Sequence, residues 1–196
     1  MTNSIAEISE QMMQRARRII HRLGIEEAWQ AVGAEPHLVG SVSMGLLMTH
    51  RDIDYHIYSS PLHIEDSFAA VARIAAHCGV EHLSYLNLLH TEEACIEWHL
   101  AFRDECGEMW QIDMIHIVRG SRYDGYFERQ AACIAAALTP ESREVILRLK
   151  YETPPDSKIA GIEYYRAVIE GGVCDYEAFE EWRRQHPVTG IVEWMP

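Results

Sequence analysis

Two aspartates separated by one residue could share a single chemical site. Asp52 and Asp54 lie in the segment 51–59, whose apolar–polar alternation predicts a β-strand. Side chains two positions apart point to the same face of a strand, so their Cα atoms would lie roughly 6.5–7 Å apart. Neighbouring carboxylates repel each other unless a cation lies between them. Oxygen ligands without nearby thiolates favour magnesium, which we expect this pair to bind.

A glycine and a serine upstream could bind a phosphate group beside that site. Gly40 and Ser41 end a predicted strand, and ten residues separate Ser41 from Asp52. Where a strand runs into a short helical turn, free backbone N–H groups and a serine hydroxyl can face an anion. A glycine lets the phosphate approach the backbone closely. The two pairs together predict a site for a metal ion and a phosphorylated ligand.

These motifs resemble the signature of the DNA polymerase beta-like nucleotidyltransferase superfamily. The resemblance rests on the glycine–serine pair, the ten-residue spacing and the paired aspartates among hydrophobic residues, and it covers residues 38–58. The superfamily also has a third acidic residue on a later, neighbouring strand. Asp113 fits that position, because it is flanked by apolar residues in a segment predicted to be a strand.

The resemblance implies a metal-dependent transferase. Such an enzyme moves a nucleoside monophosphate from a nucleoside triphosphate, such as ATP, to a hydroxyl of a small molecule or a protein. Asp52 and Asp54 would hold two magnesium ions, and Asp113 would ligate the second ion and take the proton of the acceptor as a general base. The two metals would stabilise the entering and leaving oxygens while pyrophosphate is released.

The positive charge that a triphosphate needs must come from elsewhere in the chain. Many members of the superfamily have basic residues just after the glycine–serine pair, where this sequence has Val42 and Met44. We expect Lys158 and Arg166 to lie two turns apart on one predicted helix and to bind nucleotide from broadly similar faces. The full set of candidate cations is Arg51, Lys150, Lys158 and Arg166.

The acidic composition of the chain bears on its partners. Thirty Asp and Glu residues against 17 Lys and Arg residues give a formal charge of −13. A protein that binds duplex nucleic acid needs a basic face, and the sequence contains no block rich in Lys or Arg. We therefore expect a nucleoside triphosphate and a small-molecule or protein acceptor, and we argue against nucleic acid as a partner.

Cysteine usage and hydropathy bear on the compartment. The five cysteines are scattered without a C-x-x-C pair, which argues against a zinc ribbon or a disulfide framework. The longest apolar run, 131–138, is far too short to span a membrane, and the first thirty residues contain no apolar signal core. We expect a cytoplasmic protein without membrane contact.

Periodicity predicts the elements that must position these residues. Strands are expected over 37–42, 51–59, 95–103 and 108–118, and 81–89 is ambiguous. Helices are expected over 4–23, 26–32, 60–79, 126–138, 140–151, 158–170 and 175–185. This order predicts an α+β fold with a mixed or antiparallel sheet flanked by helices. We expect a catalytic core over 1–120 and a helical C-terminal region, 121–196, packed on it.

Two other functions stay open on the sequence. A catalytically inactive binding or regulatory protein on the same fold is compatible with the missing basic residues after Ser41. A phosphoesterase could use the same D-x-D metal site. A hydrolase would release phosphate from a generic aryl phosphate, whereas a transferase would release pyrophosphate only when an acceptor is present.

Overall fold

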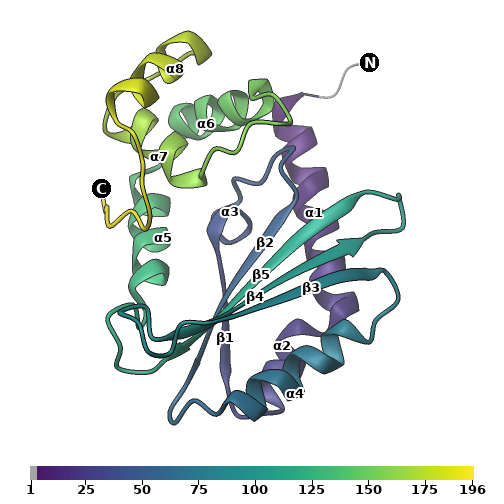
Figure 1. Ribbon diagram of the computed structural model, residues 1–196. Coiled ribbons are helices and arrows are strands. Elements are labelled where there is room, and N and C mark those ends of the chain that lie inside the picture. Colours follow the sequence, from purple (N-terminus) through teal and green to yellow (C-terminus); the bar gives the residue numbers. More distant parts are fainter. Residues whose placement is uncertain (1–3) are drawn as a thin grey trace.

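In the computed structural model, which describes residues 4–196, five strands form one sheet in the order β1-β2-β5-β4-β3 (Figure 1). Strands β2 and β5 are parallel, and the other neighbouring pairs are antiparallel. The predicted α+β class with a mixed sheet is confirmed. The strands are β1 (Glu35–Val39), β2 (Asp52–Ser59), β3 (Val80–Asn87), β4 (Cys95–Arg103) and β5 (Met109–Val118).

Helices cover one face of this sheet and one of its ends (Figure 1). The face is covered by α1 (Ile5–Leu23), α2 (Ile25–Gln30) and α4 (Ile64–Ala75), and α3 (Gly40–Ser43) is a short turn between β1 and β2. No helix within residues 4–196 is long and apolar enough to cross a membrane. The C-terminal helices are α5 (Tyr126–Ala137), α6 (Pro140–Glu152), α7 (Gly161–Ile169) and α8 (Tyr176–Gln185).

Local signals account for the first helix. The Ser4 hydroxyl accepts from the Glu7 N–H, and the Glu7 carboxylate accepts from the Ser4 N–H, which forms a capping box. Gly24 ends α1 in the left-handed conformation, with φ of 56°. Apolar residues at helical spacing, Ala16 and Leu23 among them, face the core. The predicted helix over 4–23 is therefore confirmed.

Alternation accounts for β4 and for the two faces of the sheet. Trp98 and Leu100 point toward α4 and the core, and they are almost fully buried. Glu97 and His99 lie on the opposite face and remain partly exposed. Residues in register across neighbouring strands share a face, so β5 continues the same division into an apolar side and a polar side.

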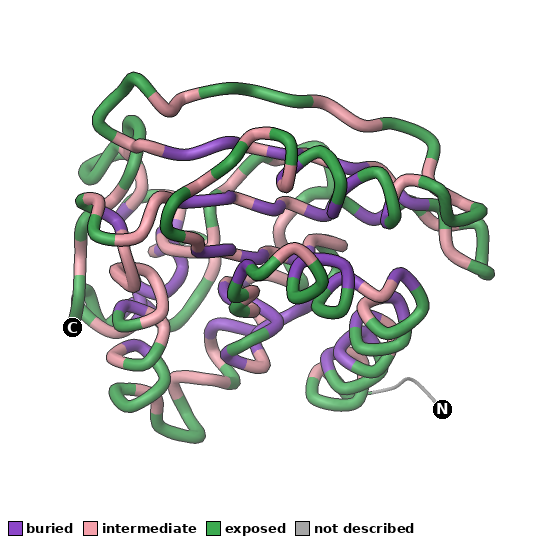
Figure 2. Tube along the Cα trace, turned by 90° about the horizontal axis from the view of Figure 1, so that it is seen from below, coloured by how far each residue is buried: buried purple, intermediate pink, exposed green. Residues whose placement is uncertain are grey.

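Two hydrophobic clusters make up most of the core. The larger cluster joins the apolar face of the sheet to α1, α2 and α4. The second cluster joins the four helices α5, α6, α7 and α8 to one another. Met44, Leu46 and Met48, which follow α3, belong to the second cluster although they precede β2 in the chain. Figure 2 shows buried stretches in both the strands and the helices. The turn between β1 and β2 therefore lies where the two clusters meet, and the proposed boundary at residue 120 stays a prediction.

Several predicted boundaries were wrong, and three of them have a clear local reason. The strand expected over 37–42 ends at Val39, because Gly40 takes a φ of 65° and starts a helical turn. The helix expected from Ser60 starts at Ile64, after an extended His63. The helix expected from Lys158 starts at Gly161, where the Glu163 carboxylate accepts from the Ala160 N–H, 3.0 Å away.

We expect Trp98→Ala to lower the free energy of unfolding by about 3–5 kcal/mol, the range for emptying a large aromatic site in a core. The indole is 2% exposed, and its Nε1 donates to Ser67 Oγ at 2.8 Å. Tyr151→Ala is the control, because that ring is 49% exposed. Urea unfolding measures both, and equal losses in the two variants would contradict this packing.

Candidate active site

The parallel pairing of β2 and β5 brings the three predicted acidic residues to one face of the sheet. Asp54 lies level with Asp113 in the register, and Asp52 lies level with Gln111. Residues level with each other on paired strands point to the same side, as do residues two apart on one strand. All three carboxylates therefore project from the polar face, which the C-terminal helices leave partly open.

A glycine makes room for the central carboxylate. A Cβ atom added at Gly40 would lie 2.1 Å from Asp54 Oδ2, a distance that real side chains do not reach. Gly40 also has a φ of 65°, which favours glycine. The close approach follows from the pairing of β1 and β2, in which Val39 lies level with Asp54. The predicted partnership of the Gly-Ser pair with the aspartates therefore has a direct contact behind it.

The charge on Asp54 is poorly compensated. Burial raises the pKa of this carboxyl well above its usual value, and the negative charges of Asp52 and Asp113 raise it further. The ammonium group of Lys150 acts in the opposite direction without reversing the shift. A carboxylate in this state is stabilised by any cation that enters the site.

Asp113 is held by neighbours on β4 and β5. His99 Nδ1 donates to Asp113 Oδ1 at 2.8 Å, and Gln111 Nε2 lies 2.9 Å from Asp113 Oδ2. Burial alone would lower the pKa of His99, but the hydrogen bonds and charges of Asp113 and Glu97 raise it. Within the described chain, no three His, Cys, Asp or Glu side chains converge closely enough to hold a metal ion. The predicted spacing of the three carboxylates stays a prediction.

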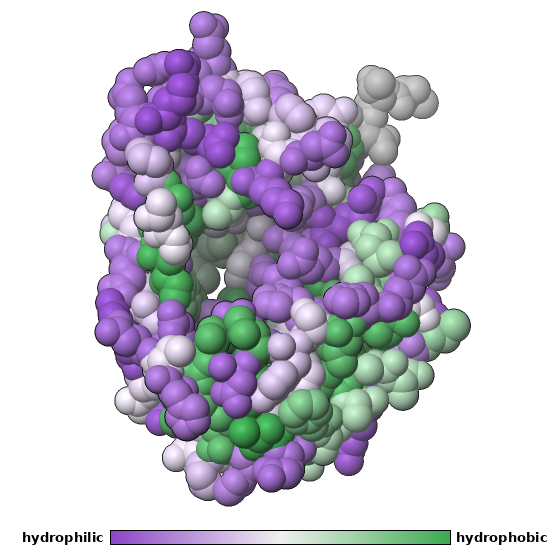
Figure 3. Space-filling view, viewed as in Figure 1, coloured by the Kyte–Doolittle hydropathy of each residue, from purple (hydrophilic) through white to green (hydrophobic). Residues whose placement is uncertain are grey.

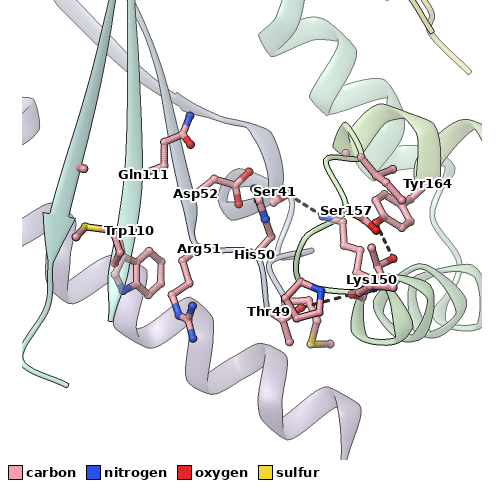
Figure 4. A pocket seen from close by; sticks show the side chains of 18 of the residues that line it. Ser41, Thr49, His50, Arg51, Asp52, Trp110, Gln111, Lys150, Ser157 and Tyr164 are labelled. Atoms are coloured by element: carbon pink, nitrogen blue, oxygen red, sulfur yellow. Dashed lines mark hydrogen bonds between the residues drawn. The ribbon is translucent and has the colours of Figure 1, made fainter. Parts of the chain in front are cut away.

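Lys150 is the cation that reaches the Gly-Ser turn. Its Nζ donates to Ser41 Oγ at 2.8 Å (Figure 4). It also donates to the Leu46 carbonyl at 3.0 Å and to the Tyr165 hydroxyl at 3.1 Å. Ser41 is buried, and its hydroxyl also lies 3.1 Å from that of Tyr165. These contacts join α6 and α7 to the turn between β1 and β2. An ammonium group and two hydroxyls therefore converge beside Asp52 and Asp54.

Two cavities open beside this group of residues. The larger has a volume of about 720 Å³ and is lined by His50, Arg51, Trp110 and Gln111 among others (Figure 4). The smaller has a volume of about 280 Å³. Figure 3 shows the surface hollowed between the C-terminal helices and the sheet. Both cavities share three lining residues, Ser41, Asp52 and Gly161.

The smaller cavity is lined by both apolar and polar side chains. Phe127, Ile134 and Ile162 are among the apolar ones, and Asp54 and His56 are among the polar ones. Burial lowers the pKa of His56 to about 4, so its ring is neutral at pH 7. The cavity therefore offers flat apolar surface next to a few polar groups, an arrangement typical of small-molecule sites.

The predicted cations lie in different places. Arg51 lines the larger cavity, where its guanidinium pairs with Glu108. Lys158 is exposed in the loop before α7 and lines neither cavity. The prediction that it shares a helix with Arg166 was therefore wrong, because that helix begins at Gly161. Arg166 also lies outside both cavities, where it pairs with Glu170 and covers the Trp182 ring at 5.6 Å.

Sequence reasoning could name Lys150 as a candidate but could not select it. Lys150 and Ser41 are 109 positions apart, and no local pattern links them. Tyr165 is buried among the apolar residues of α7, as core packing requires, yet its hydroxyl reaches the site. The selection depends on how α6 and α7 pack against the turn.

Comparison with known proteins shows the fold. No family model and no curated protein sequence matches this chain. Solved structures do match, among them a cytoplasmic RNA terminal U-transferase (16% identity, TM-score 0.54, 82% of this chain and 48% of that one). Cid1, an RNA terminal uridylyl transferase, matches at 14% identity and a TM-score of 0.57, over 81% of this chain and 48% of that one. The GLD-2–GLD-3 poly(A) polymerase complex matches at 11% identity and a TM-score of 0.56, over 95% of this chain and 64% of that one.

The chain shares the fold of these nucleotidyltransferases, the fold that its motifs indicated. It spans about half the length of the first two solved structures above. At these identities the likeness establishes the fold alone. Activity, substrates and metal use are separate questions.

The argument against nucleic acid as a partner was wrong. The matching structures are those of an RNA terminal U-transferase, a poly(A) polymerase and the polymerase core of an RNA surveillance complex. A small-molecule or protein acceptor has no support among them. Net charge sums over the whole protein surface, whereas the end of an RNA strand would contact only a few local groups. A charge of −13 therefore does not exclude such a partner.

Gly40→Ala tests the contact with Asp54, and Gly33→Ala is its matched control. Gly33 has a φ of 77° with nothing within 4 Å of an added Cβ, so alanine there meets only the backbone penalty of about 1–2 kcal/mol. We expect Gly40→Ala to destabilise the fold by clearly more, because the added methyl group would also collide with the carboxylate. Urea unfolding measures both variants. Equal losses would show that Asp54 does not lie against Gly40.

Asp54→Asn is expected to stabilise the protein at neutral pH in buffer without divalent ions. The folded state holds the Asp54 proton to a higher pH than the unfolded chain does. Stability therefore falls as pH rises from the usual carboxyl pKa through the raised one, and asparagine removes that loss. The advantage should vanish below about pH 4, where both states are protonated. Urea unfolding between pH 4 and pH 8 measures it, with the exposed Asp156→Asn as the control.

Proposed function

We propose that this chain transfers a nucleoside monophosphate from a nucleoside triphosphate to a terminal ribose hydroxyl of RNA. The observation that carries the proposal is the junction at which Gly40 and Ser41 meet Asp54 on one side and Lys150 on the other. A phosphate-binding turn, paired carboxylates and a cation therefore lie within one hollow of the surface. The matching solved structures support RNA as the acceptor.

The triphosphate would lie against Ser41 and Lys150. The ammonium group of Lys150 already forms hydrogen bonds with two hydroxyls, and an anionic oxygen would form a stronger, charge-assisted bond with it. Backbone N–H groups of the α3 turn, next to Gly40, would meet further phosphate oxygens. Lys150 takes the place of the basic residues that are missing after Ser41.

We propose that the two carboxylates of β2 bind a divalent cation, magnesium, together with oxygens of the substrate. Asp52 and Asp54 share one strand face, and the raised pKa of Asp54 marks a charge that a cation would stabilise. Asp113 has hydrogen bonds to His99 and Gln111, and its oxygens keep lone pairs for a shared ligand. Magnesium bound there would neutralise phosphate charge and stabilise the entering and leaving oxygens.

The two cavities suggest where the substrates lie. The smaller cavity, whose lining includes the ring of Phe127, suits the nucleoside of the donor, and the larger cavity has room for the end of the acceptor strand. The ribose hydroxyl would attack the α-phosphorus, the bond to the bridging oxygen of the β-phosphate would break, and pyrophosphate would leave. Asp113, at the side of the larger cavity where His99 lies, would accept the hydroxyl proton.

A second candidate function is supported by the state of Asp113. Its carboxylate is engaged by His99 and Gln111, and the described residues contain no three-ligand group. A protein that binds nucleotide without transferring it would have this arrangement. A transfer assay separates the two functions.

Lys150→Met is expected to weaken binding of a magnesium-bound nucleoside triphosphate by at least about tenfold, as for the loss of a charge-assisted hydrogen bond. Lys158→Met is the matched control, because it changes the only other lysine, which is exposed and outside both cavities. Isothermal titration calorimetry measures binding, and thermal unfolding checks that both variants fold. Equal binding by the two variants would remove Lys150 from the site.

Transfer itself is tested with a short RNA, a labelled nucleoside triphosphate and magnesium. We expect one or more added nucleotides and matching pyrophosphate release, abolished by Asp113→Asn and by an RNA with a 3′-deoxy end. Nucleotide binding without any transfer would favour the inactive protein. Phosphate release from an aryl phosphate without an acceptor would favour a phosphoesterase.

A further inference from the structure

The last residues of the chain return to the wall of the smaller cavity. The segment 190–196, which we call the terminal segment, runs from α8 back toward α5 and α7 (Figure 1). There Gln130, a buried residue of α5 that lines the smaller cavity, donates from Nε2 to two backbone carbonyls. The distances are 3.1 Å to the oxygen of Val192 and 2.6 Å to that of Trp194.

Side chains hold the terminal segment in this position. The Glu193 carboxylate accepts from Arg122 Nη2 and, at 3.1 Å, from the Tyr123 hydroxyl. On the other side, the guanidinium of Arg166 lies 5.9 Å from the centre of the Trp194 ring, which packs against the second hydrophobic cluster. The two carbonyls that Gln130 meets are therefore fixed on both sides of Glu193.

These contacts determine which end of the Gln130 amide faces the cavity. A primary amide has two N–H donors on nitrogen and one carbonyl oxygen, which only accepts. Backbone carbonyls cannot donate, so the flipped amide would leave Val192 and Trp194 facing another acceptor. With both N–H groups used by the terminal segment, the group that Gln130 has left for a ligand is Oε1, an acceptor.

We propose that Gln130 is a specificity-determining residue for the donor nucleotide and that the terminal segment sets its orientation. This proposal rests on the proposed function, which places the nucleoside in the smaller cavity. Gln130 Oε1 would accept from an N–H of the base or an O–H of the ribose. A ligand that places a carbonyl oxygen or a C–H there leaves the buried acceptor unpaired, and sites of this kind discriminate strongly.

The test is the spread of affinities within a set of nucleotides. Dissociation constants are measured with magnesium for the four common ribonucleoside triphosphates and for the 2′-deoxy form of the tightest. We expect the wild type to show a spread of at least tenfold. Gln130→Met keeps the shape without the acceptor and should reduce the spread to within about threefold. Loss of the base ranking assigns Oε1 to the base, and loss of the deoxy difference assigns it to the ribose.

Two further variants make the test independent of one substitution. Trp194→Ala leaves Gln130 in place but loosens the terminal segment, so it should also reduce the spread. Gln185→Met is the matched control, because that glutamine is exposed on α8, donates to Glu181 and lines neither cavity, so it should leave the spread unchanged. Thermal unfolding confirms that each variant folds. If Gln130→Met does not fold, the spread of affinities in Trp194→Ala decides whether the proposal holds.

An unchanged spread in folded Gln130→Met, or a wild type that binds all five nucleotides equally, would overturn the proposal while leaving the transferase function intact. A wild type that binds no triphosphate at all would overturn the proposed function, and the role of Gln130 with it. The two failures are therefore distinguishable in the same titrations.

Discussion

The carboxyl group of Asp54 lies against the backbone of Gly40, and the arrangement of the site follows from that contact. The carboxylate fits only because residue 40 has no side chain. Its pKa is raised by burial and by the two aspartates beside it, while Lys150 offsets part of the effect. The pairing of β1, β2 and β5 holds these groups together, and a cation is the ligand that would relieve their repulsion.

The site lies where two hydrophobic clusters meet, and this explains why its parts come from distant segments. The sheet supplies the carboxylates, whereas α6 and α7 supply Lys150 and Tyr165. The turn that carries Ser41 is anchored on the second cluster by Met44 and Leu46. Movement of the C-terminal helices relative to the sheet would therefore alter the contact between Lys150 and the turn that carries Ser41.

The negative net charge of the chain does not conflict with its having the fold of proteins that act on RNA. Many arginines are already paired with carboxylates, as Arg51 is with Glu108 and Arg103 with Glu81. Net charge therefore says little about the hollow itself, where one ammonium group and two hydroxyls converge. Recognition of a strand end needs a few well-placed groups, whereas recognition of a duplex needs an extended basic face.

Features that depend on neighbours in the chain could be predicted from the sequence. The capping box at Ser4, the alternation of β4 and the Gly-Ser and D-x-D motifs are local patterns with local causes, and they led to the correct fold. The choice among cations could not be predicted, because Lys150 meets Ser41 across 109 positions while Lys158 and Arg166 face elsewhere. The same holds for His99 on Asp113 and for the terminal segment on Gln130. Which side chains share a cavity is determined by the packing of whole elements, and tertiary structure alone decides it.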